Sequence, residues 1–107
     1  MSQIELGEVI ATRELQLSAA GGPDRIVSVR IGKPRPFSDG RDYFCPYQIT
    51  GVGDEKVSAA AGIDSVQALQ LVMTAVGADL FALNRSCYGG LNWEGGKHGD
   101  LGFPTLD

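Results

Sequence analysis

The strongest constraint in this sequence is one long apolar segment with a clear helix start signal. In GIDSVQAL, residues 62–69, Asp64 is a suitable N-cap residue and Gln67 stands three positions later as its capping-box partner. Apolar residues then recur at spacings of three and four, which predicts an amphipathic helix over about 65–84. The predicted buried stripe consists of Val66, Leu69, Met73, Val76, Leu80 and Leu83.

This segment is also apolar outside that stripe. A helix that lies on a single sheet normally shows a wider polar face than this one does. We therefore expect the back of the helix to be covered, either by the C-terminal tail or by a second copy of the protein. The surplus apolar residues are Ala68, Leu71, Val72, Ala75, Ala78, Phe81 and Ala82.

Two stretches before the helix alternate apolar and polar residues with a period of two. They are EVIATRELQL, residues 8–17, and RIVSVRI, residues 25–31, with the turn signal AAGGPD between them. This pattern predicts a β-hairpin with one buried face. Arg13 falls in the inward row and interrupts it. The other inward residues are Val9, Ala11, Leu15, Leu17, Val27, Val29 and Ile31.

A third strand is predicted at 42–50, DYFCPYQIT, after a loop that contains Pro34 and Pro36. Because Pro46 has no N–H group, this strand must lie at a sheet edge there or contain a bulge. One face carries Tyr43, Cys45, Tyr47 and Ile49, and the other carries Phe44, Pro46, Gln48 and Thr50.

The segment VSAAAG, residues 57–62, predicts a short fourth strand whose small side chains allow another element to approach closely. We expect Ala59 and Ala61 to face the helix. Their predicted partners there are Ala68, Val72 and Ala75.

These elements predict an α+β fold in a single domain, residues 1–107. About four strands form an antiparallel meander, and the long helix packs on one of its faces. The Gly-rich tail, residues 88–107, is expected to be ordered and to pack on the body. Within it, Leu91 and Trp93, then Leu101 and Phe103, alternate like two short strands.

Composition restricts the environment and the chemistry. The chain has 43% hydrophobic residues, a net charge of -4 and two cysteines without metal-ligand spacing. Its start, MSQIELGEVI, resembles no secretory signal, and we expect a cytoplasmic protein that needs no membrane, metal or cofactor. The net negative charge makes nucleic acid an unlikely partner.

The charge is nevertheless unevenly placed. Residues 25–41 hold five basic side chains against one acid, Asp39, whereas the remaining chain has four basic and twelve acidic residues. This basic stretch and the outer face of the third strand are the candidate surface for a partner. The candidate residues are Arg30, Lys33, Arg35, Arg41, Phe44 and Gln48.

A catalytic alternative would use Cys45 with His98, the single histidine. A nucleophilic cysteine needs a thiolate, and hence a basic neighbour or a helix N-terminus. Cys45 has no adjacent cation in the sequence, which favours a buried structural role.

The motifs CPYQITG, GIDSVQALQL and LNW...HGDLGFP together resemble a family of small bacterial proteins known only as a domain of unknown function. The resemblance covers about residues 28–104, and its most specific part is the combination CPYQI-G and G-DS-QAL, followed by a W...DLG-P tail. The resemblance implies a compact single domain of bacterial origin. It implies no catalytic residues.

Three functions remain open at this stage. We expect a non-enzymatic binding or regulatory protein, for example an inhibitor or immunity-type protein that acts on a protein partner. The alternative is a small-ligand binder or enzyme that uses Cys45, His98 and the basic loop 30–41. The second alternative is a structural homodimer.

Overall fold

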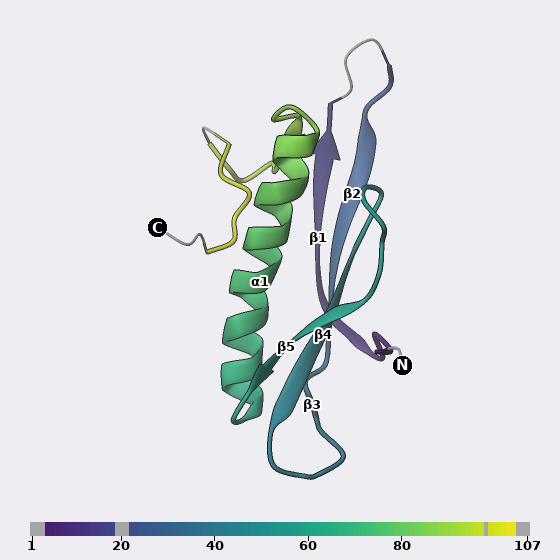
Figure 1. Cartoon of the computed structure of the whole chain (residues 1–107). Coiled ribbons are helices and arrows are strands. Elements are labelled where there is room, and N and C mark those ends of the chain that lie inside the picture. Colours follow the sequence, from purple (N-terminus) through teal and green to yellow (C-terminus); the bar gives the residue numbers. More distant parts are fainter. Residues whose placement is uncertain (1–3, 19–21, 98, 105–107) are drawn as a thin grey trace.

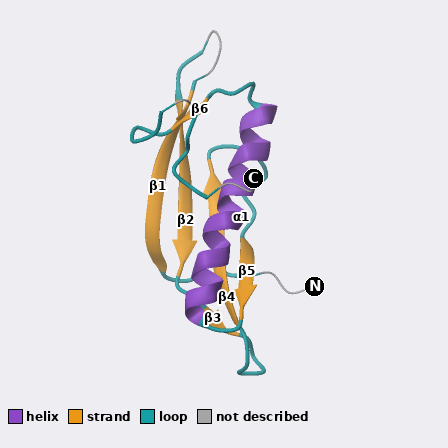
Figure 2. Cartoon of the chain, turned by 90° about the vertical axis from the view of Figure 1, so that its left-hand side faces the viewer, coloured by secondary structure: helices purple, strands orange, loops and turns teal. Residues whose placement is uncertain are grey.

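The computed structural model describes residues 4–18, 22–97 and 99–104 of the chain. It confirms the α+β fold: an antiparallel sheet lies on one side and a single long helix covers one of its faces (Figures 1 and 2). The molecule measures 50 × 29 × 21 Å, so it is a thin two-layer slab. Its elements are β1 (Val9–Leu17), β2 (Arg25–Gly32), β3 (Arg35–Pro36), β4 (Tyr43–Thr50), β5 (Ser58–Gly62), α1 (Ser65–Ser86) and β6 (Leu91–Asn92).

The sheet has six strands rather than the predicted four. β2 lies between β1 and β4, β6 pairs with the end of β1, and β5 pairs with β4. The two additional strands, β3 and β6, have two residues each. β3 forms inside the proline-rich loop because Arg35 and Pro36 continue along β4 after β2 has ended.

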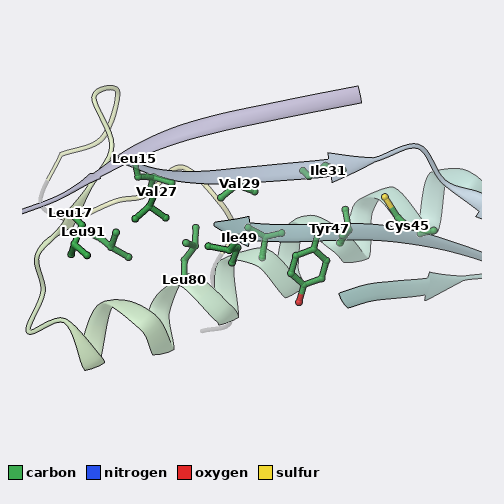
Figure 3. Packing of buried hydrophobic residues seen from close by; sticks show 13 residues of the cluster. Leu15, Leu17, Val27, Val29, Ile31, Cys45, Tyr47, Ile49, Leu80 and Leu91 are labelled. Atoms are coloured by element: carbon green, nitrogen blue, oxygen red, sulfur yellow. The ribbon is translucent and has the colours of Figure 1, made fainter. Parts of the chain in front are cut away.

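β2 and β4 face the core as predicted, and so do Leu15 and Leu17 of β1. The prediction for Val9 is wrong, because the β1–β2 register shifts between Val9 and Ala11, so that Val9 pairs with Gly32 and lies on the outer face. Ala11 keeps the inward side but is exposed near the end of the strand. The inward residues of these strands pack with the helix in one cluster, and Figure 3 shows several of them between the sheet and α1. The buried members from the strands are Leu15, Leu17, Val27, Val29, Ile31, Cys45, Tyr47 and Ile49.

The predicted buried stripe of the helix is partly wrong. α1 buries Ala68, Val72, Val76 and Leu80, whereas Val66 is 64% exposed. The observed stripe advances by four residues at a time and therefore drifts around the helix as it crosses the twisted sheet. Because apolar residues lie on almost every side of this segment, periodicity alone does not choose among the possible stripes.

The predicted contact of Ala59 and Ala61 with the helix is also wrong. Ala60 pairs with the buried Cys45 and packs against the core, so Ala59 and Ala61 lie on the other face of the sheet. Next to Ala60, Gly62 touches the helix so closely that a Cβ there would lie 2.5 Å from the Ala68 nitrogen. Ala60 and Gly62 therefore form the contact with α1, and an all-small strand offers no polar alternation from which to predict this.

The described part of the tail, residues 88–97 and 99–104, packs on the body. Arg13 lies between two tail rings, with its Cζ atom 3.9 Å from the Trp93 centroid and 4.8 Å from that of Phe103. Its Nη1 donates to the Gly102 carbonyl at 2.8 Å. The alternation at Leu91 produces β6, but residues 101–103 form no strand.

The described residues of the tail lie along one flank of α1. A Cβ at Gly77 would lie 2.3 Å from the Pro104 carbonyl oxygen, so the tail crosses the helix there in direct contact. Leu71 and Phe81 stay 44% and 62% exposed. α1 is long enough and apolar enough to cross a membrane. A core helix passes the same test, and α1 buries one stripe against the sheet as a core helix does.

Candidate functional site

Pro46 marks a bulge in the sheet. Between the pairs Ile31 to Tyr47 and Arg35 to Phe44, the β2–β3 segment advances four residues while β4 advances three. One extra residue is therefore inserted opposite β4, and the bulge frees the Gly32 carbonyl to accept a hydrogen bond from the Cys45 thiol at 3.3 Å. This arrangement gives Cys45 a structural role.

Cys45 is fully buried, and its burial raises the pKa of the thiol to about 11. A thiol in this state is protonated at neutral pH and has no access to substrate, so Cys45 is not built as a nucleophile. Its proposed companion His98 lies outside the described residues.

The structure separates the six predicted partner-binding residues. Arg30 and Gln48 are paired on adjacent strands of the outer face, meaning the sheet face away from α1. Gln48 has a local role, because its Nε2 donates to the Glu55 carbonyl at 2.8 Å and holds the loop between β4 and β5. Its position on the outer face is as predicted, but its amide is used within the protein.

Lys33 and Arg41 lie apart from this face. Lys33 lines a shallow hollow with Tyr43 and Leu69 on the helix side of the molecule. Arg41 is exposed in the turn before β4, where its backbone N–H donates to Asp39 Oδ1 at 2.9 Å. The basic stretch is therefore not one continuous surface.

Arg35 and Phe44 do come together, in a hollow of about 540 Å³ that we call the aromatic groove. The guanidinium carbon of Arg35 lies 5.0 Å from the Phe44 ring centroid, and the Phe37 ring lies 5.0 Å from the same ring. Phe37 is 41% exposed. The groove is lined by Ile4, Glu5, Arg35, Phe37, Phe44, Ala59, Ala60 and Ala61.

The bulge and the N-terminal segment build this groove. The bulge carries Arg35 onto β3 directly opposite Phe44. The segment before β1 crosses the outer face so closely that a Cβ at Gly32 would lie 2.3 Å from the Leu6 carbonyl oxygen. There the Glu5 carbonyl accepts a hydrogen bond from Arg35 Nη2 at 2.6 Å, which fixes the guanidinium over the ring.

Sequence reasoning found two members of this groove and missed the others. Phe37 follows Pro36 in a predicted loop, and Ile4 precedes the first predicted strand. The available signal was the presence of two aromatic residues, Phe37 and Phe44, on either side of the turn SDGRD. Their convergence depends on β3, which no local pattern predicts.

A second hollow, of about 460 Å³, lies between α1 and the β4–β5 loop. The Tyr47 hydroxyl donates to Asp79 Oδ2 at 2.5 Å, and Lys56 and Ser58 line the same wall. Burial and then the Asp79 carboxylate raise the pKa of Tyr47, so its hydroxyl stays protonated at neutral pH. The group is therefore a polar anchor that can orient a ligand, and it is not a base.

The comparisons with known proteins support the resemblance seen in the motifs. A family described as "Domain of unknown function (DUF6968)" matches residues 11–105. No curated protein and no solved structure matches the chain. Since the family match spans both the sheet and the helix together with most of the tail, the chain belongs to the DUF6968 family.

Proposed function

We propose that this protein is a non-enzymatic binding protein that docks a protein partner in the aromatic groove. The observation that supports this proposal is the cluster of Arg35, Phe37 and Phe44 on the sheet face away from α1. Arginine and large aromatic residues supply much of the binding energy in protein interfaces. A monomeric fold gains little by leaving such a cluster open to water.

The groove fits an apolar side chain of the partner. Its floor is formed by the Phe44 ring and the methyl groups of Ala59 and Ala61, which share the outer face. The Arg35 guanidinium is held at one wall and favours a carboxylate next to that apolar side chain. The partner surface that we propose therefore presents an apolar anchor beside an acidic residue.

The acidic residues outside the groove support an inhibitory role, in which they would meet a basic part of the partner next to the anchor. Twelve of the thirteen acidic residues lie outside the stretch 25–41. A small acidic protein can cover a basic functional site and approach it under electrostatic steering. We therefore include an immunity-type inhibitor of a toxin, in a bacterial cytoplasm, in this proposal.

The hollow at Tyr47 and Asp79 supports a second candidate, the binding of a small polar ligand. The fixed hydroxyl–carboxylate pair and Lys56 offer both donors and acceptors there. Thermal shift measurements with small amines, carboxylates and phosphates would test it. The Asp79→Asn variant should lose any stabilisation that the wild type shows.

The main experiment is co-purification of the tagged protein from its own cells, followed by titration of the captured partner. We expect Phe44→Ala and Arg35→Ala each to lower the affinity for that partner by about tenfold or more. Phe81→Ala serves as the matched control, since Phe81 is exposed on the opposite layer. Equal affinity of all three variants and the wild type would contradict docking in the groove.

A further inference from the structure

The strand β5 ends the sheet with a free edge. It pairs with β4 on one side, and within residues 4–18, 22–97 and 99–104 no backbone group bonds to its other side. Its side chains are serine, alanine and glycine, with no charge and no bulk to protect the edge. An unprotected edge of this kind is a template for another strand.

The sequence around β5 is complementary to itself. The segment KVSAAAGID, residues 56–64, is centred on Ala60. On each side of Ala60 come two small residues, then one apolar residue, then one charged residue. The two terminal charges have opposite signs. Antiparallel pairing of two copies about Ala60 would place Ala59 opposite Ala61, Ser58 opposite Gly62, Val57 opposite Ile63, and Lys56 opposite Asp64.

We infer that the protein forms a two-fold symmetric dimer in which β5 pairs with β5 of a second copy, centred on Ala60. The ladder itself spans Ser58 to Gly62, and residues 63 and 64 form the bend into α1. The Lys56 ammonium then approaches the partner's Asp64 just beyond each end of the new ladder. Pairing centred on Ala59 would instead bring Asp54 opposite the partner's Asp64. Like charges therefore disfavour that register.

The helix supplies a second surface along the same edge. Met73 and Gly77 contact the tail on one flank, whereas Ala82 lines the hollow beside Ser58 on the β5 flank. Residues spaced by three and four from Ala82 share its flank. They include Leu71, Ala75 and Ala78, and of these Leu71 and Ala78 are exposed.

Two such helices fit beside each other across the two-fold axis. Among the described strands, α1 packs mainly on β4 and β5. With strands about 4.8 Å apart, helices centred between β4 and β5 in each copy would lie about 10 Å from each other. That is the spacing at which helices with small contact residues pack. The dimer thus covers Leu71 and Ile63, the latter 70% exposed in the single chain.

This inference does not depend on the proposed function. An axis perpendicular to the sheet keeps both helices on one side, so both aromatic grooves would open on the other side of one continuous sheet. A partner with two anchors could then engage both grooves. Dimer formation and partner binding are measured separately, and either can fail alone.

Sedimentation equilibrium of the full chain across a concentration series provides the first test. We expect a concentration-dependent shift from 11.3 kDa to twice that mass. Lys56→Glu should weaken the dimer by about tenfold, because it turns two attractive pairs into repulsive ones. Lys97→Glu makes the same change in charge in the tail and should leave the dimer unchanged.

A second substitution makes this charge test specific. Asparagine is also a good N-cap, so Asp64→Asn removes the charge and retains the start of the helix. Alone, Asp64→Asn should weaken the dimer several-fold. Combined with Lys56→Glu, it should partly restore the dimer that Lys56→Glu weakens. Additive weakening in the double variant would show that the two residues do not meet across the interface.

Disulfide trapping locates the interface directly. In a Cys45→Ala, Cys87→Ser background, Ala60→Cys should form a covalent dimer under mild oxidation, because opposed residues of antiparallel strands have Cα separations within disulfide range. Cys45 is removed because it lies opposite Ala60 on β4 and could form a disulfide within one chain. Ile26→Cys, exposed on the outer face of β2, is the control. A monomer at all concentrations up to roughly 1 mM, or a dimer that Ala60→Cys does not trap above the control, would overturn the inference.

Discussion

The guanidinium carbon of Arg13 lies 3.9 Å from the centroid of the Trp93 ring and joins the first strand to the tail. Arg13 also contacts the Phe103 ring and donates to the Gly102 carbonyl. A charged residue in the inward row of β1 is thus matched by two aromatic rings and a carbonyl from the far end of the chain. This contact explains why the tail is ordered despite its glycines.

We predict that Arg13→Ala lowers the free energy of unfolding by about 1–2 kcal/mol, because it removes both the stacking and the hydrogen bond. Arg13→Lys should give a smaller loss, since an ammonium keeps the charge without the planar fork. Chemical denaturation followed by Trp93 fluorescence measures both. Unchanged stability and emission in Arg13→Ala would show that the tail is held by other contacts.

Gly77→Ala is expected to destabilise the protein, although glycine to alanine normally favours a helix by about 0.5–1 kcal/mol. The added methyl group would lie 2.3 Å from the Pro104 carbonyl oxygen and would push the tail away. Thermal unfolding should show a lower midpoint, with increased solvent exposure of Trp93. Gln70→Ala, on an exposed part of α1, is the control and should be neutral or stabilising. A gain in stability from Gly77→Ala would mean that the tail does not lie there in solution.

Cys45 should make the protein less stable at alkaline pH. Its thiol pKa rises from 9.0 to about 11 on folding, so between these values the unfolded chain releases a proton that the folded chain retains. Stability is therefore complete below pH 9 and falls as the pH rises through this window, by up to about 3 kcal/mol.

Denaturant titrations at pH 7, 8.5 and 10 measure this effect. Cys45→Ala should be less stable at pH 7, because it removes a buried sulfur and the bond to Gly32, but it should lose less stability between pH 8.5 and 10. Cys87→Ala provides the comparison at the half-buried cysteine. Rapid alkylation of Cys45 in the folded protein near neutral pH would contradict its buried role and revive the catalytic alternative.

The two faces of β5 should differ in their tolerance of larger side chains. Ala60→Leu is expected to cost about 1–3 kcal/mol because it overpacks the contact with α1. Ala61→Leu should be tolerated within about 0.5 kcal/mol, since Ala61 is exposed on the outer face. Equal costs for the two variants, measured by urea denaturation, would show that β5 has the opposite orientation.

Local patterns predicted the elements that carry their own signals. The Asp64 side chain does accept from the Gln67 N–H at 2.8 Å and begins the helix. The alternation placed the inward faces of β2, β4 and the second half of β1 correctly, but it gave no sign of the register shift that puts Val9 on the outer face. For the candidate site, Phe44 was found from this alternation and Arg35 from the basic stretch 25–41. Phe37 and Ile4 were missed because their positions depend on segments without periodicity.

The sequence by itself determined the four longer strands and where the helix starts, because capping and hydrophobic periodicity act between residues only a few positions apart. Only the tertiary structure decided three further features. They are the side of α1 that is buried, the face of β5 that meets it, and the convergence of Arg35 with Phe44 across the bulge at Pro46. The first two depend on a choice between faces that differ little in polarity, which long-range packing resolves. The third depends on the pairing of β3 with β4, two segments that the chain itself does not mark as partners.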